Sequence, residues 1–131
     1  MAEVDPALHQ FSGRGWLLDP GDRARLLQRF PPVYADVVAH HVSFAPTHAF
    51  MPDALGAAVV GRADDGSGVE ALVVSIGGTT HRPDGGRYHI TWSLDRAGGR
   101  RAADSNRVIA ERGWTALEAP VPIRLAPGSG A

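Results

Sequence analysis

The sequence predicts a single domain that mixes β-strands with two helices, and three observations support this. The chain has 131 residues, which is enough for one compact domain with a core and too few for two ordinary domains. Hydrophobic residues make up 44% of the chain and charged residues 21%, as is typical of globular proteins. Several β-branched runs are separated by turn signals, and two segments have helical features. We therefore treat residues 1–131 as one domain.

Strands are predicted where β-branched and aromatic residues form short runs bounded by glycine, proline or aspartate. The turn "DDGSG" between two such runs predicts a hairpin. Pro120 and Pro122 cannot donate to a ladder, so the last strand is expected toward an edge of the sheet. The predicted strands are 13–19, 37–45, 57–63, 69–76, 87–94 and 115–125.

Two helices are predicted from their start signals and apolar positions. Asp19 and Pro20 are typical of a helix start, and the "GDRARLLQRF" that follows has apolar residues on one side until the double proline ends it. A second, shorter helix is expected to start at 104–106 and to end at Gly113.

The remaining segments are predicted to be irregular. Residues 1–12 and 126–131 are expected to be flexible ends, and Thr47–Leu55 is interrupted by prolines. The segment 77–86, "GGTTHRPDGG", is the most turn-rich part of the chain and is expected to be a mobile loop.

Charge and composition narrow the function classes. Thirteen basic residues, all arginine, against 14 acidic residues give a net charge of −1, which argues against binding along a nucleic-acid backbone and leaves a local anion site open. Without cysteine, any catalysis must use oxygen or imidazole groups. No apolar run is long enough to span a membrane and the N-terminus does not resemble a signal peptide, so we expect a soluble cytoplasmic protein. We also expect a monomer.

A four-residue pattern of histidine, hydrophobic residue, serine or threonine, and hydrophobic residue occurs twice, at 41–44 ("HVSF") and 89–92 ("HITW"). Because alternate side chains of a strand share a face, His41 and Ser43 should point one way from their strand, and His89 and Thr91 one way from theirs. The opposite positions of the second strand, from Tyr88 to Leu94, are apolar. If the strands lie near one another, two imidazoles and two hydroxyls face an open groove, where they could serve as acid, base and phosphate ligands.

These paired tetrapeptides resemble those of the two-histidine phosphoesterase superfamily. Together with "VEALVVSI" and "ADSNRVIAERG", they are closest in pattern to the cyclic phosphodiesterase domain of fungal and plant tRNA ligases and to related 2′-5′ RNA ligase-like proteins, over about residues 15–125. The resemblance implies a compact, two-lobed α+β fold, with antiparallel sheets lining a central cleft and helices outside. It also implies hydrolysis of a 2′,3′-cyclic phosphate at an RNA end or in a related small nucleotide, in RNA repair or processing.

Residue roles follow from the resemblance. It implies that His41 and His89 are the catalytic acid and base, without assigning which is which, that Ser43 and Thr91 bind the phosphate, and that no metal or cofactor is needed. Arg87 shares the face of His89 in the predicted strand and is a further phosphate ligand, although an outward salt bridge fits it equally well. A nucleotide-binding or RNA-binding module without turnover, or a purely structural subunit, stays open as an alternative.

Other polar and aromatic residues are expected to have structural roles. Ser105 and Asn106 fit a helix N-cap better than a substrate contact. His40 should alternate onto the face of Val38 and Val42, as a buried or helix-contacting residue. The three tryptophans, Trp16, Trp92 and Trp114, are expected in the core rather than as stacking platforms for a base.

Overall fold

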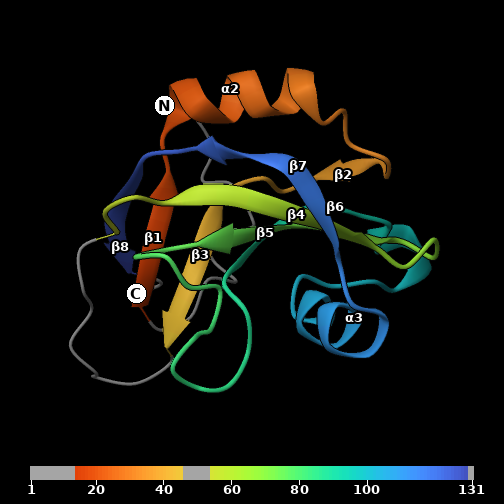
Figure 1. Cartoon of the computed structure of the whole chain (residues 1–131). Helices are drawn as coiled ribbons and strands as arrows, with labels where there is room; N and C mark the ends of the chain where they lie inside the picture. The colour runs from red at the N-terminus through yellow and green to blue at the C-terminus, as the bar shows by residue number, and fades with distance from the viewer. Residues whose placement is uncertain (1–13, 46–53, 130–131) are drawn as a thin grey trace.

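The computed structural model of the protein describes residues 14–45 and 54–129. The segment 1–12, predicted to be flexible, lies outside these residues, as does most of the irregular segment 47–55. The described part has a mixed α/β fold with one open antiparallel sheet of eight strands and two α-helices (Figure 1). The predicted combination of strands with two helices is confirmed.

The elements follow the predicted runs, with differences at the first motif strand and at the C-terminus. The strands are β1 (Arg14–Leu18), β2 (Asp36–Val37), β3 (His41–Ala45), β4 (Ala58–Asp64), β5 (Val69–Ser75), β6 (His89–Leu94), β7 (Thr115–Pro122) and β8 (Leu125–Ser129). The helices are α2 (Pro20–Arg29) and α3 (Asp104–Arg112), with a short 3-10 turn η1 (Arg96–Gly98).

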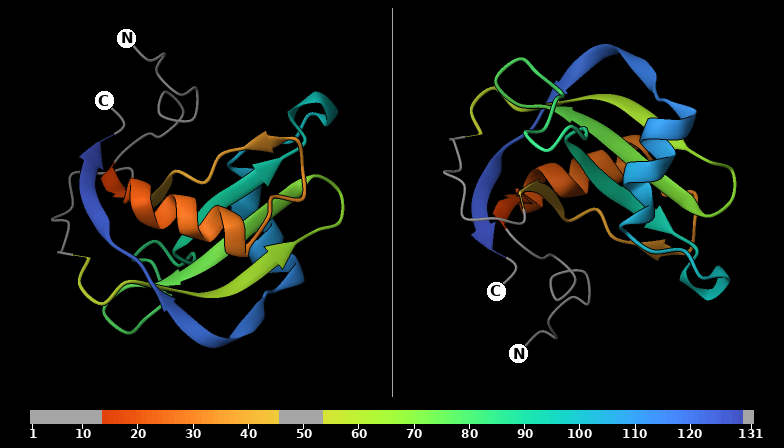
Figure 2. Two further views of the ribbon diagram at one scale, coloured as in Figure 1. Left: turned by 90° about the horizontal axis from the view of Figure 1, so that it is seen from above. Right: turned by 90° about the horizontal axis from the view of Figure 1, so that it is seen from below.

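The sheet lies between the two helices, so it has a core on each face (Figures 1 and 2). Its strands pair in the order β7-β4-β5-β6-β3-β1-β8, and β2 pairs with β6. Helix α2 covers a core that includes Trp16, Ile90 and Trp92, whereas α3 covers a smaller core that includes Val73 and Val108. The two strands that carry the repeated pattern, β3 and β6, are neighbours in the middle of the sheet.

Helix α2 begins and ends as its sequence predicts. The Asp19 side chain accepts a hydrogen bond from the backbone N–H of Asp22 at 3.0 Å, and Pro20 occupies the first turn, where its missing N–H costs nothing. Leu26 and Phe30 are buried against the sheet. The helix therefore packs on one face of the sheet through its apolar side.

The predicted strand 37–45 is broken in the middle. Ala39 has φ 48° and is the one non-glycine residue with positive φ in the described ranges. Its buried backbone is held by Arg23, whose side chain donates to the carbonyls of Ala39 (2.7 Å) and Val38 (3.3 Å). This kink separates β2 from β3. His40 is half-buried and lines a cavity beside α2, which agrees with the predicted helix contact but not with full burial.

Strand β6 changes faces near its end because of a β-bulge. The register with β5 shifts between Glu70 and Ala71, opposite Trp92. Before the bulge, Ile90 and Trp92 lie in the α2 core as predicted, but Leu94 lies in the α3 core. The prediction that Leu94 shares their face is therefore wrong, because the extra residue inverts the alternation.

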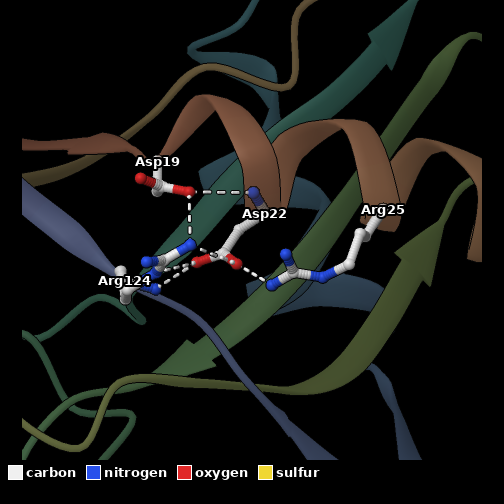
Figure 3. Close-up of polar contacts among 4 residues, drawn as sticks. All are labelled: Asp19, Asp22, Arg25 and Arg124. Carbon is white, nitrogen blue, oxygen red and sulfur yellow. Dashed lines mark hydrogen bonds and ion pairs between the residues drawn. The ribbon is translucent and has the colours of Figure 1, made fainter.

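Residues 126–129 of the tail that was predicted to be flexible are paired, and 130–131 lie outside the described residues. The predicted strand 115–125 ends at Pro122, and the tail, predicted to be flexible from 126, forms β8 up to Ser129 along the edge of β1. Between them, the backbone N–H and the guanidinium of Arg124 bind the buried carboxylate of Asp22, and the guanidinium also contacts Asp19 at 3.0 Å (Figure 3). Arg25 contacts Asp22 from the other side. This cluster fixes the turn that leads into β8 against the start of α2.

Candidate functional site

The two tetrapeptides face each other across one strand pair. Strands β3 and β6 are antiparallel, with Val42 opposite Ile90. Continuing this register by one residue in each direction places Ser43 across from His89 and His41 across from Thr91. Both Val42 and Ile90 are fully buried in the α2 core. The four motif side chains therefore belong to the opposite face of the sheet, on the side of α3.

The β3 half of this face matches the sequence prediction. His41 and Ser43 are half-buried, whereas the alternating residues Val42 and Phe44 are buried. Helix α3 packs on β4 and β5 and thus over the other half of the sheet (Figure 2, right). An imidazole and a hydroxyl of β3 consequently lie beside the helix and are accessible to solvent.

His89 is buried and electrically neutral. Its side chain is 8% exposed, and Nδ1 lies 2.9 Å from the carbonyl oxygen of Arg87. Since a carbonyl only accepts, Nδ1 carries the proton and Nε2 carries the lone pair. Burial lowers the pKa of His89 from 6.5 to about 4, against a smaller upward effect of the Arg87 hydrogen bond. At neutral pH this imidazole can accept a proton, but it has none to give from Nε2.

Thr91 does not face an open groove, which corrects the sequence prediction. The residue is 7% exposed, and its hydroxyl lies 2.9 Å from Ser105 Oγ and 3.3 Å from the carbonyl oxygen of Ala102. The cause is the start of α3, which packs over this position and supplies both partners. The bond to Ala102 is long for a hydroxyl donor, whereas the bond to Ser105 has ordinary length.

The N-cap prediction for Ser105 and Asn106 is also wrong. The helix begins at Asp104, within the predicted range, so its N-cap residue is Ala103, which makes no side-chain capping bond. The fully buried Ser105 binds Thr91 instead, and Asn106 Oδ1 accepts a hydrogen bond from Arg82 at 2.9 Å. Both residues thus connect α3 to the second motif strand and to the loop before it.

Arg87 lies next to His89 and contacts the loop before β6. Its Nη1 donates to Thr80 Oγ1 at 2.5 Å and lies 3.2 Å from His81 Nε2. The guanidinium therefore has polar partners in the loop and leaves further N–H groups for a ligand. Arg87 and His89 line the same cavity.

This cavity, which we call the His89 cavity, lies between α3 and the loop 85–87 and has a volume of about 310 Å³. It combines polar groups with the apolar side of the helix. Its lining residues are Gly85, Gly86, Arg87, His89, Asn106, Ile109, Ala110, Gly113 and Trp114. A larger and more apolar cavity of about 560 Å³ lies beside α2 and β8, is lined in part by His40, and contains none of the four motif residues.

Arg82 is a site residue that the sequence indicated only weakly. Its guanidinium binds both Asp84 (2.8 Å) and Asn106 (2.9 Å) and is 10% exposed. The hydrogen bond from Arg82 is the main cause of the lowered pKa of Asp84. The loop 77–86, predicted to be mobile, is thus attached to α3. The signal in the sequence was an arginine in a glycine-rich turn directly before a motif strand.

In residues 14–45 and 54–129, no three histidine, aspartate or glutamate side chains are grouped so that they could hold a metal ion. Neither helix in this part of the chain is long and apolar enough to cross a bilayer.

Comparisons with family models, with curated proteins and with solved structures find no match for this chain. The interpretation of the site therefore depends on its own geometry and on the resemblance of the two tetrapeptides.

Proposed function

We propose that the protein is a phosphodiesterase that hydrolyses a 2′,3′-cyclic phosphate, at an RNA end or in a related nucleotide, by two-histidine acid and base catalysis without a metal ion. The observation that carries this proposal is the pairing of β3 with β6. It brings His41, Ser43, His89 and Thr91 onto one face from positions far apart in the chain. The two motif strands are neighbours in the middle of one continuous sheet.

The charge state of His89 favours it as the general base. Neutral Nε2 takes a proton from water while the water oxygen bonds to phosphorus. His41, in its protonated form, then gives a proton to the ribose oxygen as the bond from that oxygen to phosphorus breaks. The products are a phosphomonoester and a free ribose hydroxyl. The negative phosphate raises the pKa of His89 in the complex and so makes it a stronger base there.

Three side chains are available to bind the phosphate. Ser43 is half-exposed across from His89, and Arg87 lies beside it. Thr91 is buried under the start of α3, so it can donate to phosphate only if this segment moves and the hydroxyl proton turns away from Ala102; the shorter contact with Ser105 can be kept with Ser105 as the donor. Hydroxyl and guanidinium donors directed at developing charge on phosphate are a recurrent means of stabilising a transition state.

The size of the site and the net charge favour a small or terminal substrate. A net charge of −1 gives little attraction for a long polyanion, whereas the arginines near His89 can bind one phosphate. A cyclic phosphate at an RNA end or on a single nucleotide meets this condition.

The test is incubation of the protein with nucleoside 2′,3′-cyclic monophosphates in excess chelator, with the 2′- and 3′-monophosphate products resolved. We expect hydrolysis by the wild type and a loss of about a hundredfold or more in His41→Ala. His40→Ala is the matched control: it removes the neighbouring imidazole, which lines the cavity beside α2 and whose ring lies edge-on to His41 with centroids 6.0 Å apart. Saturable binding without any product would instead identify a binding module with the same cleft. Equal rates in His41→Ala and His40→Ala would contradict the mechanism.

A further inference from the structure

One wall of the His89 cavity is an aromatic ring that lies against the sheet at Gly61. A Cβ atom on Gly61 would lie 2.1 Å from Cε3 of Trp114, so the indole occupies the space above the strand that a side chain would fill. Gly113 has φ 74°, a conformation that favours glycine, and it turns the chain from α3 toward this position. Unlike the fully buried Trp16 and Trp92, Trp114 is only half-buried and lines the cavity.

The opposite rim is polar and is held in place. Asn106 accepts from Arg82 at 2.9 Å and donates to the carbonyl oxygen of Ala103 at 3.2 Å. Arg82 in turn packs against Gly86, where a Cβ atom would lie 2.5 Å from its Nη2. These contacts fix the rim without a ligand, so the entropy cost of ordering it on binding is small.

The cavity suits a flat heteroaromatic ring better than it suits a phosphate. A phosphate needs donors and makes no use of an indole, whereas a nucleobase can contact Trp114 and Ile109 with its faces and Asn106 with its edge. A volume of about 310 Å³ is at the lower end of the range for small-molecule sites and fits one base. His89 and Arg87 at the same cavity lie where the attached ribose phosphate would be.

We propose that the His89 cavity binds the single nucleobase of the nucleotide that carries the cyclic phosphate, with Trp114 as its aromatic contact. This inference rests on the proposed function for the position of the phosphate, but it concerns a separate subsite. Trp114 packs against the α3 core, as expected from the sequence, and in this proposal its exposed part also contacts the base, while Asn106 gains a role at the opposite rim. It also implies that substrates lacking a base lose affinity.

The kinetic test uses a substitution on α3 that places a larger side chain in the cavity. Ala110 lines the cavity and is exposed, so Ala110→Leu narrows the subsite without disturbing the core, and Glu111→Leu is the matched control on the adjacent exposed position. With a nucleoside 2′,3′-cyclic phosphate, we expect kcat/KM to fall about tenfold or more in Ala110→Leu, in line with the loss of one base contact, and to be unchanged in Glu111→Leu. With 1-O-methylribose 2′,3′-cyclic phosphate, which has no base, both variants should match the wild type. Equal losses with the two substrates, or no loss with either, would overturn the inference while leaving the phosphodiesterase proposal intact.

A binding test works even if there is no turnover. Tryptophan fluorescence is followed while a nucleoside 2′- or 3′-monophosphate, ribose 5-phosphate or inorganic phosphate is added. We expect saturable quenching by the nucleoside monophosphates only, its loss in Trp114→Phe, and a dissociation constant about tenfold higher in Ala110→Leu. If the wild type hydrolyses nothing but shows this pattern, the proposed activity fails and the base subsite stands. If inorganic phosphate and nucleotide behave alike, or if Ala110→Leu binds nucleotide as the wild type does, the subsite is refuted.

Discussion

Lowering the pH should destabilise the folded protein through one buried side chain, His89. Its pKa is lowered from 6.5 to about 4, chiefly by burial. In the unfolded chain the imidazole regains its ordinary pKa, so between these two pH values the unfolded state binds a proton that the folded state does not. Stability therefore rises with pH across this window. The destabilisation is absent above about pH 7 and grows as the pH falls toward 4.

The pKa difference sets the magnitude. A shift from 6.5 to about 4 corresponds to about 3 kcal/mol when the titration is complete, and to about 2 kcal/mol between pH 7 and pH 5. Because His89 is only 8% exposed, solvent screening reduces this figure little. The effect of His89 is best measured between pH 7 and pH 5, since carboxylates with ordinary pKa values near 4 change the unfolding free energy little above pH 5.

The assay is urea unfolding at pH 7 and pH 5, followed by the fluorescence of the buried Trp16 and Trp92. The pH dependence of the unfolding free energy should be about 2 kcal/mol smaller in His89→Gln than in the wild type. Val73→Ala is the matched control, because Val73 is buried directly across from His89 on β5 and its truncation weakens the same region without removing an imidazole. If His89→Gln kept the wild-type pH dependence, the assignment of His89 as a buried neutral imidazole would be refuted.

Three further predictions concern the candidate site and the cluster of Asp22 with Arg25 and Arg124. Ser43→Ala should lose about 2 to 4 kcal/mol of transition-state stabilisation, seen mainly as a lower kcat in steady-state kinetics. Thr91→Val should show this loss and also a free energy of unfolding in urea that is lower by about 1 to 3 kcal/mol, because it leaves the buried Ser105 without its partner. If His89 is the base, kcat/KM should fall as the pH drops toward about 4, the pKa of His89 in the free enzyme. The fall in kcat should come at a higher pH, because bound phosphate raises this pKa, and chelator should change neither profile. A fall in kcat/KM near pH 6.5 would show that another group is the base. Asp22→Ala should lower the free energy of unfolding, measured in urea, by about 2 kcal/mol. This is less than for a fully buried ion pair, because the arginine partners of Asp22 are two-thirds exposed. An unchanged unfolding midpoint would show that the cluster of Asp22 with Arg25 and Arg124 does not stabilise the fold.

Alternation along strands was sufficient to predict much of the site. Val42 and Phe44 are buried and His41 and Ser43 are not, as a period of two requires. The helix start at Asp19 was also readable, because capping depends on residues close in sequence. Alternation cannot predict a β-bulge, which moves the residues after it to the other face of the sheet. The bulge at Trp92 inverts the faces of β6, and its cause lies in the pairing with β5, not in β6 itself.

The parts that sequence reasoning missed depend on contacts between distant residues. The kink at Ala39 is a conformation that alanine adopts rarely, and the donors that hold it come from Arg23 on α2. The position of Ser105 under Thr91 depends on how α3 docks on the sheet. Trp114 packs against the α3 core, as predicted, but nothing near it in the sequence shows that its ring lies over Gly61, on another strand.

The pairing of β1 with β8 has a consequence for how the chain folds. Arg14 pairs with Ser129, near the two ends of the described chain, so this ladder closes a very long loop and is expected to form late. During synthesis, β1 can pair with β3 early, but its other edge stays open until the last strand has left the ribosome. An open strand edge is a template for pairing with other chains. A chain that stops before Leu125 should therefore aggregate during expression, even though it contains both histidine strands and both helices.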